Sequence, residues 1–514
     1  MASVTCVGAV ADMSLRANVA ASYASQIYVS LMGIVMMPIY LQYMGPESFG
    51  LIAFFAVLQG WFQLLDLGLT PTLSREAARF SGGATDGLTL RRLLRVLECI
   101  FGIVAIGGAA SLVAGADWIG TNWLQAQQLP STQLRHAIEL MGGIIAARWM
   151  SSLYRSALSG LEFQVWLGKM SVVSATVRFV GVIPVLVFLG ATPVHFFVFQ
   201  SLAAVVETGA LMRKTYRCLP ALAPESTVGI SLSPLRGVLR FSLGLAFTSA
   251  VWVAVTQTDK LLLSRLLSLS DYAYFALAAL VASGVTIVSG PLSGALLPRL
   301  SRLHAQGRHD ELVALYRRST QGMAVIATPV TVVLACAAEP LLYAWTGDTH
   351  LAARAAPILQ LYAMGNGVLA MSAFAYYLQF AKGDVQLHFI GSIVFVLVLI
   401  PSIWLATVSH GAMGAAWAWL SANIAYALLW VPMVHRRFAP GLHWPWLLQD
   451  VAAIAAPVVA GALMLTRWAP WPQGRFAITA FLILIVFLAL GIAALASSQI
   501  RSLIWIRIAA TKHA

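Results

Sequence analysis

The stretch LLDLGLTPTLSREAARF, Leu64–Phe80, decides the fold because an apolar segment ends within it. Its apolar part contains one aspartate, Asp66, and is followed by Pro71 and then by Arg75 and Arg79. We expect the proline and the arginines to end a membrane-spanning helix and to anchor it at a charged membrane face. Asp66 lies about one turn before this end. A structural role, in contact with interfacial water or an arginine, is therefore favoured over the alternative role in transport.

The composition places the whole chain in a membrane. Of the 514 residues, 60% are hydrophobic and only 10% are charged, whereas soluble domains carry about a quarter charged residues. Apolar runs of about 20 residues recur along the chain, long enough to cross a hydrocarbon core of ~30 Å as helices. We therefore predict an all-α polytopic membrane protein with about 14 transmembrane helices.

The net charge of +13 is explained by membrane topology rather than by a nucleic-acid partner. With the N-terminus in the cytoplasm, most of the 32 lysines and arginines fall in cytoplasmic loops and helix ends, as the positive-inside rule requires. An even number of spans then places both termini in the cytoplasm. The four cysteines form no CxxC pair and the ten histidines are scattered, so we expect neither a metal site nor a cofactor.

The opening stretch has a second copy that divides the chain into halves. Pro71–Arg75 (PTLSR) differs from Pro298–Arg302 (PRLSR) only at its second residue, and each copy ends the second predicted span of its half. Internal repeats are typical of secondary transporters. The predicted organisation is two pseudo-symmetric six-helix lobes, 1–213 and 237–437, joined by a cytoplasmic linker, 214–236, and followed by two additional transmembrane helices with a cytoplasmic tail, 438–514.

Two further stretches carry a resemblance to a known family. PIYLQYMGPESFGLIAFF (38–55) and the opening stretch resemble the start of bacterial polysaccharide (O-antigen type) flippases, and TDKLLLSRLLSLSDYAYFALAAL (258–280) resembles the start of their second half. These flippases belong to the MOP superfamily, together with multidrug extrusion proteins and the peptidoglycan lipid II flippase. The resemblance implies a V-shaped pair of six-helix lobes. It also implies that a lipid-linked oligosaccharide crosses the bacterial inner membrane by alternating access.

A pyrophosphate head group that crosses hydrocarbon needs positive charge at depth, because an unpaired charge in lipid is costly. Arg178 lies near the middle of the fifth predicted span, and Arg148 and Glu98 lie at a similar depth in the fourth and third spans. Two arginines against one glutamate leave a positive surplus, and the guanidinium fork suits a pyrophosphate. The alternative is an ion pair that only joins helices of this lobe.

Other polar residues within spans are candidates for parts of the same process. Asp259 and Lys260 are adjacent on the seventh span, so we expect them to have separate partners. Lys260 either receives the head group or extends to the outer interface. Glu207 either couples transport to an ion or makes a hydrogen bond between helices. Candidate contacts to sugar hydroxyls are Gln360, Asn366 and Asn423.

Three functions compete. The preferred one is a flippase that binds undecaprenyl-pyrophosphate-linked oligosaccharide, works among membrane lipids as a monomeric transport unit, and has a polysaccharide polymerase and glycosyltransferases as partners. The second is an ion-coupled multidrug extrusion transporter, which normally has twelve spans and an acidic cavity. The third is a membrane polymerase or ligase, which the short outer loops disfavour. The chain has no HExxH, CxxC or Walker A pattern, so no enzyme activity is expected.

Overall fold

The computed structural model describes residues 15–219 and 233–502. Within this part of the chain the backbone is helical and forms no β-strand, apart from an isolated bridge between Gln125 and Ser268. The predicted all-helical fold class is therefore confirmed. Contacts divide the chain into two compact units, Met1–Ala273 and Tyr274–Ala514. The division into repeated lobes remains a prediction.

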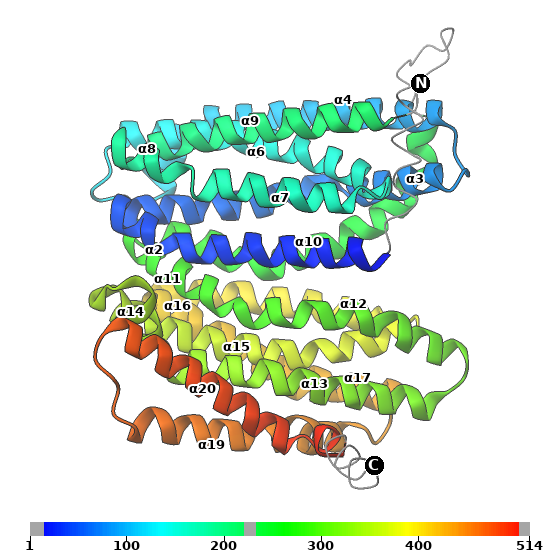
Figure 1. Cartoon of the computed structure of the whole chain (residues 1–514), viewed down its shortest axis with the longest axis vertical. Coiled ribbons are helices and arrows are strands. Elements are labelled where there is room, and N and C mark those ends of the chain that lie inside the picture. The colour runs from blue at the N-terminus through cyan, green and yellow to red at the C-terminus, as the bar shows by residue number, and fades with distance from the viewer. Residues whose placement is uncertain (1–14, 220–232, 503–514) are drawn as a thin grey trace. The chain divides into compact units, whose positions relative to one another are not determined.

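Most helices of the first unit are long (Figure 1). In chain order, the elements of this unit are α2 (Leu15–Phe62), the 3-10 turn η1 (Gln63–Asp66), α3 (Leu69–Ser81), α4 (Gly87–Ala114), α5 (Ala116–Trp118), the π-helical turn η2 (Ile119–Trp123), α6 (Ser131–Gly160), α7 (Gln164–Phe179), α8 (Val182–Phe188), α9 (Pro193–Cys218) and α10 (Ser233–Leu266).

The boundary between the units falls within α11 (Leu269–Ala282). The second unit continues with α12 (Gly284–Ala305), α13 (His309–Cys336), α14 (Ala338–Thr346), α15 (Thr349–Ala381), α16 (Gln386–Ala425), the π-helical turn η3 (Tyr426–Trp430), α17 (Val431–Phe438), α18 (His443–Pro445), the π-helical turn η4 (Trp446–Ala452), α19 (Ala453–Trp468) and α20 (Arg475–Ala496).

The described residues contain ten segments long and apolar enough to cross a membrane. Two of them, Ala21–Asp66 and Gln386–Phe438, would be about 70 and 80 Å long if straight, more than twice the ~30 Å hydrocarbon core. Each is broken at a glycine outside the helical region, Gly45 (φ 79°) or Gly411 (φ 58°), and so supplies two crossings. Helices α6 and α10, with 30 and 34 residues, are long enough to add two more. The total agrees with the predicted number of about 14.

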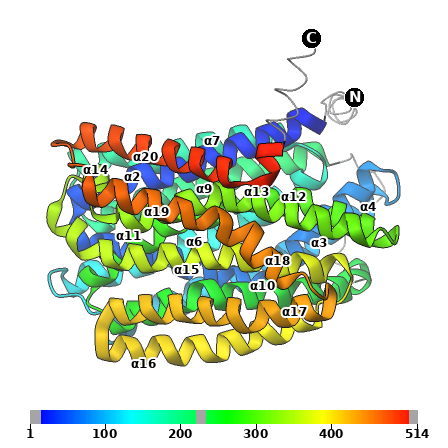
Figure 2. The same ribbon diagram turned by 90° about the horizontal axis from the view of Figure 1, so that it is seen from below.

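Contacts across α16 confirm that the chain reverses at Gly411. The indole of Trp430 packs against Gly391, and the ring of Phe395 lies 5.8 Å from that of Tyr426. We call the segments before and after Gly411 the two arms. Residue numbers rise on one arm as they fall on the other, so the two arms are antiparallel. Figure 2 shows them side by side, with α17 at the end of the second arm.

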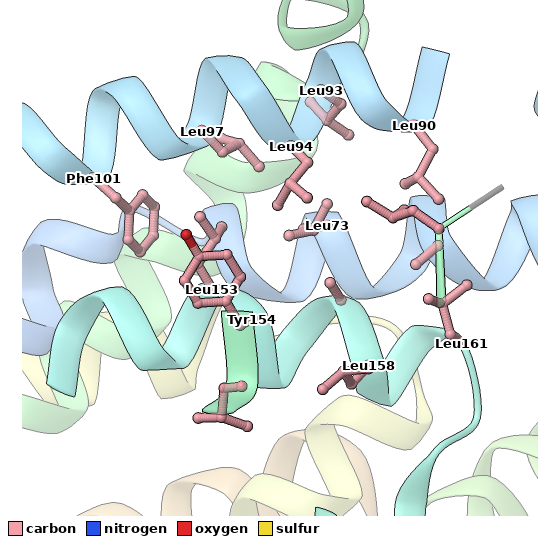
Figure 3. Packing of buried hydrophobic residues seen from close by; sticks show 14 of the residues in the cluster. Leu73, Leu90, Leu93, Leu94, Leu97, Phe101, Leu153, Tyr154, Leu158 and Leu161 are labelled. Carbon is pink, nitrogen blue, oxygen red and sulfur yellow. The ribbon is translucent and has the colours of Figure 1, made fainter. Parts of the chain in front are cut away.

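The apolar core of the first unit lies between α3, α4 and α6 (Figure 3). Leu73 of α3, Leu94 of α4 and Leu153 of α6 are buried there. The ring of Phe101 stacks on Trp149 with 4.6 Å between centroids. On its other side α6 packs against α9. This core fixes the rotation of α6 about its axis, and thereby the direction of its polar face.

In the second unit α15 is the central helix and contacts α12, α13, α14 and α16. The two C-terminal helices, α19 and α20, pack together and against α13 (Figure 1). A polar junction supports this packing. The buried Asp450 accepts hydrogen bonds from Arg317 Nε at 2.6 Å and from Gln321 Nε2 at 2.7 Å. The Ser497 hydroxyl donates to Gln321 Oε1 at 2.9 Å, which joins α20 to the same hub.

The opening stretch departs from the prediction in one respect. The helix before it ends not at Pro71 but at Leu67 (φ 48°) and Gly68 (φ 72°), which adopt left-handed backbone. Pro71 then lies in the first turn of α3, where its missing N–H costs nothing. Asp66 accepts hydrogen bonds from the Thr70 amide at 3.1 Å and the Thr70 hydroxyl at 2.7 Å. It thus stabilises the start of α3, as a structural role requires.

Candidate functional site

The fifth predicted span is broken next to Arg178. Helix α7 ends at Phe179, and α8 begins after a short bend (Figure 1). Side chains satisfy two carbonyls at the break: Arg178 O accepts from Gln200 Nε2 at 3.0 Å, and Phe179 O accepts from the Tyr40 hydroxyl at 2.7 Å. Within a membrane, interrupted helices occur where the backbone borders protein or a cavity rather than lipid. The region of the first unit around this break is therefore a candidate substrate-binding region.

The side chain of Arg178 is held by an aromatic contact. Its guanidinium carbon lies 5.2 Å from the centroid of the Phe179 ring. Among the described residues, no side chain accepts a hydrogen bond from this guanidinium. A cation that no carboxylate contacts keeps its capacity to bind an anion.

Arg148 is held by neutral groups. Its Nη1 donates to Gln59 Oε1 at 3.1 Å and its Nη2 donates to Gln200 Oε1 at 2.8 Å. The guanidinium also lies over the Phe55 ring at 5.3 Å, and its buried Nε has no partner within the described structure. Gln200 therefore joins Arg148 to the broken helix at Arg178. Both arginines remain charged groups without a carboxylate in contact.

A third arginine, Arg155, lies on the same face of α6. Its Nη2 donates to Glu207 Oε1 and its Nη1 donates to Ser171 Oγ at 2.9 Å. The charge of Glu207 also acts on Arg148 and Arg178. The three arginines outnumber the two nearby carboxylates, Glu207 and Asp66, so this part of the first unit carries a positive surplus.

Two adjoining cavities expose this polar face of α6. The first has a volume of about 580 Å³ and is lined by Arg148, Asp66, Gln59 and Trp252, among others. The second has a volume of about 450 Å³ and is lined by Arg155 and many hydroxyl groups. Thr70 and Ser152 line both. Hydroxyl groups in the second cavity come from Ser22, Ser25, Thr70, Ser74, Ser152, Ser156, Ser159 and Ser171.

Four residues of α6 follow these cavities at helical spacing. Arg148, Ser152, Arg155 and Ser159 are separated by four, three and four positions, so they lie on one side of the helix. We call these four residues the α6 stripe. It gives cationic and hydrogen-bonding groups to the two cavities. Such a surface suits an anion that carries hydroxyl groups.

Glu98 does not join the arginines as expected. Its Oε1 accepts from the Tyr154 hydroxyl at 2.9 Å, and its Oε2 accepts from the Tyr216 hydroxyl at 2.7 Å. These phenols come from α6 and α9, so Glu98 links three helices of the bundle. The carboxylate among the arginines is Glu207. The structural alternative for Glu98 therefore fits its contacts better.

The expectation of separate partners for Asp259 and Lys260 is also corrected. Lys260 Nζ lies 3.3 Å from Asp259 Oδ1 and donates to the carbonyl of Thr256. Adjacent positions on a helix point in different directions, which is why separate partners are expected. The lysine side chain is long and flexible, however, and folds back along the helix to reach its neighbour. Lys260 is therefore partly neutralised by the adjacent residue.

Two of the three side chains expected to contact sugars make hydrogen bonds within the second unit instead. Asn366 Nδ2 donates to Ala282 O at 2.9 Å, and Asn366 Oδ1 accepts from Trp419 Nε1 at 3.1 Å. Asn423 Nδ2 donates to Trp419 O at 2.8 Å. Both side chains are buried, whereas Gln360 is half-buried. The geometry of Asn366 and Asn423 is that of helix packing.

The site described so far defines a polytopic helical membrane protein with a cationic, hydroxyl-lined cavity in its first unit. Comparisons with known proteins agree with this class. A model of the polysaccharide biosynthesis protein family matches residues 15–304, which include every residue of the α6 stripe. The chain belongs to this family.

The chain is 28% identical over 245 residues to the succinoglycan biosynthesis transport protein ExoT of Rhizobium meliloti (strain 1021). That match spans 46% of each chain, so the chain spans about half the length of this curated relative.

Solved structures show the same fold. The lipid II flippase MurJ, in an inward closed conformation, matches with a TM-score of 0.71 at 13% identity, over 92% of this chain and 97% of that one. An inward-facing MATE multidrug transporter of the MOP superfamily matches with a TM-score of 0.67 at 13% identity, over 80% and 94%. The chain therefore shares the fold of these two transporters.

Proposed function

We propose that this protein is a transporter, not an enzyme, and that it flips undecaprenyl-pyrophosphate-linked oligosaccharide units across the bacterial inner membrane by alternating access. Arg148 and Arg178 bind the pyrophosphate, and the hydroxyl groups of the two cavities contact the sugars. The units supply a polymerase for cell-surface polysaccharide, and glycosyltransferases make them. Both termini lie in the cytoplasm, and the transport unit is a monomer.

One observation carries this proposal: the α6 stripe borders a cavity that combines guanidinium and hydroxyl groups. Uncharged or cationic drugs gain little from cavities whose charged lining groups are Arg148, Arg155 and one carboxylate, Asp66, so the multidrug alternative is disfavoured. A pyrophosphate gains charge-assisted hydrogen bonds from the same groups. Membership of a polysaccharide biosynthesis family supports a sugar-bearing substrate.

The test uses cells that lack the gene. We expect full-length undecaprenyl-linked units to accumulate on the cytoplasmic leaflet and surface polysaccharide to be lost. Units that reach the outer leaflet but stay unpolymerised would support the polymerase alternative. If neither the lipid nor the polymer changes, the flippase proposal is wrong and drug extrusion becomes the better explanation.

Complementation then tests the site. Arg148→Ala and Arg178→Ala should each lower the transport rate by about tenfold or more, because Arg148 lines the first cavity and Arg178 lies at the broken span that Gln200 joins to Arg148. Arg467→Ala is the matched control, since it removes the same charge from an exposed position on α19. Normal transport by both Arg148→Ala and Arg178→Ala, at normal protein levels, would remove these arginines from the mechanism.

A further inference from the structure

Helices α6 and α9 carry two matching pairs of residues. Arg148 and Arg155 are seven positions apart on α6, and their partners Gln200 and Glu207 are seven positions apart on α9. Each arginine thus meets its partner in the same register, two turns and about 10 Å apart along the helices. The two pairs are equivalent in geometry but not in charge.

The partners differ only in one group, an amide against a carboxylate. Arg148 is held by Gln200 and by a second neutral amide, so no carboxylate is bonded to its guanidinium. Arg155 is bonded to Glu207, whose negative charge opposes any anion that approaches. From these direct partners we expect an anion to bind more weakly at Arg155 than at Arg148.

The carboxylate lies behind Arg155 rather than in the cavity. The side chain of Glu207 is 9% exposed and that of Arg155 is 30% exposed, and only Arg155 lines the hydroxyl-rich cavity. Arg155 uses two of its N–H groups for Glu207 and Ser171 and has five in all. The free edge of the guanidinium can therefore bind a ligand while Glu207 stays in place.

We propose that Glu207 is a positioning residue that sets a gradient of anion affinity along the α6 stripe. It directs Arg155 toward the hydroxyl-lined cavity and weakens the binding of phosphate there. The head group is therefore passed on to Arg148 instead of being held at the first contact. Rapid transport requires binding that is strong enough to enter and weak enough to leave. This inference rests on the proposed function, and it assigns Glu207 a role other than ion coupling.

The test exchanges the partners of the two arginines. Binding of farnesyl pyrophosphate to the purified full-length protein is measured with farnesol as the uncharged control, and transport is measured in the complemented cells. Glu207→Gln makes the second pair like the first, so binding should tighten by about tenfold while transport slows. Glu207→Asp keeps the charge and should transport nearly as the natural protein does.

The double exchange Gln200→Glu with Glu207→Gln keeps the total charge and a polar partner for each arginine. If the gradient matters, this variant should fold and bind farnesyl pyrophosphate but transport poorly, because the order of the two affinities is inverted. Gln200→Glu alone should weaken the binding of farnesyl pyrophosphate. This variant tests the gradient even if Glu207→Gln fails to fold. Gln200 also donates to the Arg178 carbonyl, so the thermal stability of both variants is measured alongside.

The outcomes separate this inference from the proposed function. If the natural protein binds farnesyl pyrophosphate no better than farnesol, both are wrong. If it binds but Glu207→Gln binds equally or less tightly, only the gradient is wrong and Glu207 is a structural partner. Normal transport by the double exchange would overturn the gradient in the same way.

Discussion

Glu47 shows how one residue within a membrane protein can be wholly structural. Its carboxylate is 4% exposed and accepts hydrogen bonds from the backbone N–H groups of Gln127, Gln128 and Leu129 at 2.8 to 3.0 Å. The same loop pairs with Leu269, whose N–H donates to Gln125 O at 2.9 Å. Glu47 therefore fixes the loop between α4 and α6 against two other turns of the first unit.

Replacement of Glu47 tests this structural role. Glu47→Ala leaves three N–H groups without their acceptor, and we expect it to lower the free energy of unfolding by about 2 kcal/mol. The measurement is thermal unfolding of the purified protein in detergent. Asp117→Ala, which removes an exposed ion pair with Arg135 in the same region, should cost much less. Equal effects of the two variants would contradict the role of Glu47.

At the same scale, the sequence predicts charged residues better than it predicts their partners. Arg148, Arg178 and Glu207 stand out because charges are rare within apolar spans. Arg155 was missed because it falls near a predicted helix end, although its seven-residue spacing from Arg148 on one helix face could have revealed it. Gln200 could not be found, because its importance depends on the register between α6 and α9.

At the scale of the elements, the interrupted span of α7 and α8 places Arg178, for which we propose a role in binding the head group. Gly181 lies in the interruption, and a Cβ atom there would come within 2.4 Å of the Val177 carbonyl oxygen and 3.0 Å of the Phe199 ring. A larger residue must therefore shift the bend that carries Arg178. Hydropathy does not predict this break, since the sequence remains apolar through it.

We expect Gly181→Ala to lower the free energy of unfolding by about 1–3 kcal/mol, because the added methyl group meets backbone and the half-buried ring of Phe199. Transport should fall as well, since Arg178 moves with the bend. The control is Gly209→Ala in α9, where a Cβ meets no atom within 4 Å and alanine favours the helix. Thermal unfolding and complementation check both variants. If Gly181→Ala transports and unfolds like the control, the exact bend is not required.

At the scale of the whole molecule, the direction of transport depends on which face of the membrane the hydroxyl-lined cavity meets. Ser74 of α3 and Ser159 near the end of α6 line this cavity, so it lies in the half of the first unit that contains the turn between α3 and α4. The positive-inside rule predicts that this turn, with Arg75 and Arg79 before it, is cytoplasmic. A precursor made in the cytoplasm would then meet Arg155 before Arg148.

Cysteine labelling tests this orientation. In a variant without Cys6, Cys99, Cys218 and Cys336, single cysteines are placed at two exposed positions, Ala84 after α3 and Gln473 before α20. In spheroplasts with an intact inner membrane, a membrane-impermeant maleimide should label Gln473→Cys but label Ala84→Cys only after permeabilisation. The reverse pattern would place the hydroxyl-lined cavity on the outer side. The proposed path from Arg155 to Arg148 would then run against the direction in which a precursor must travel.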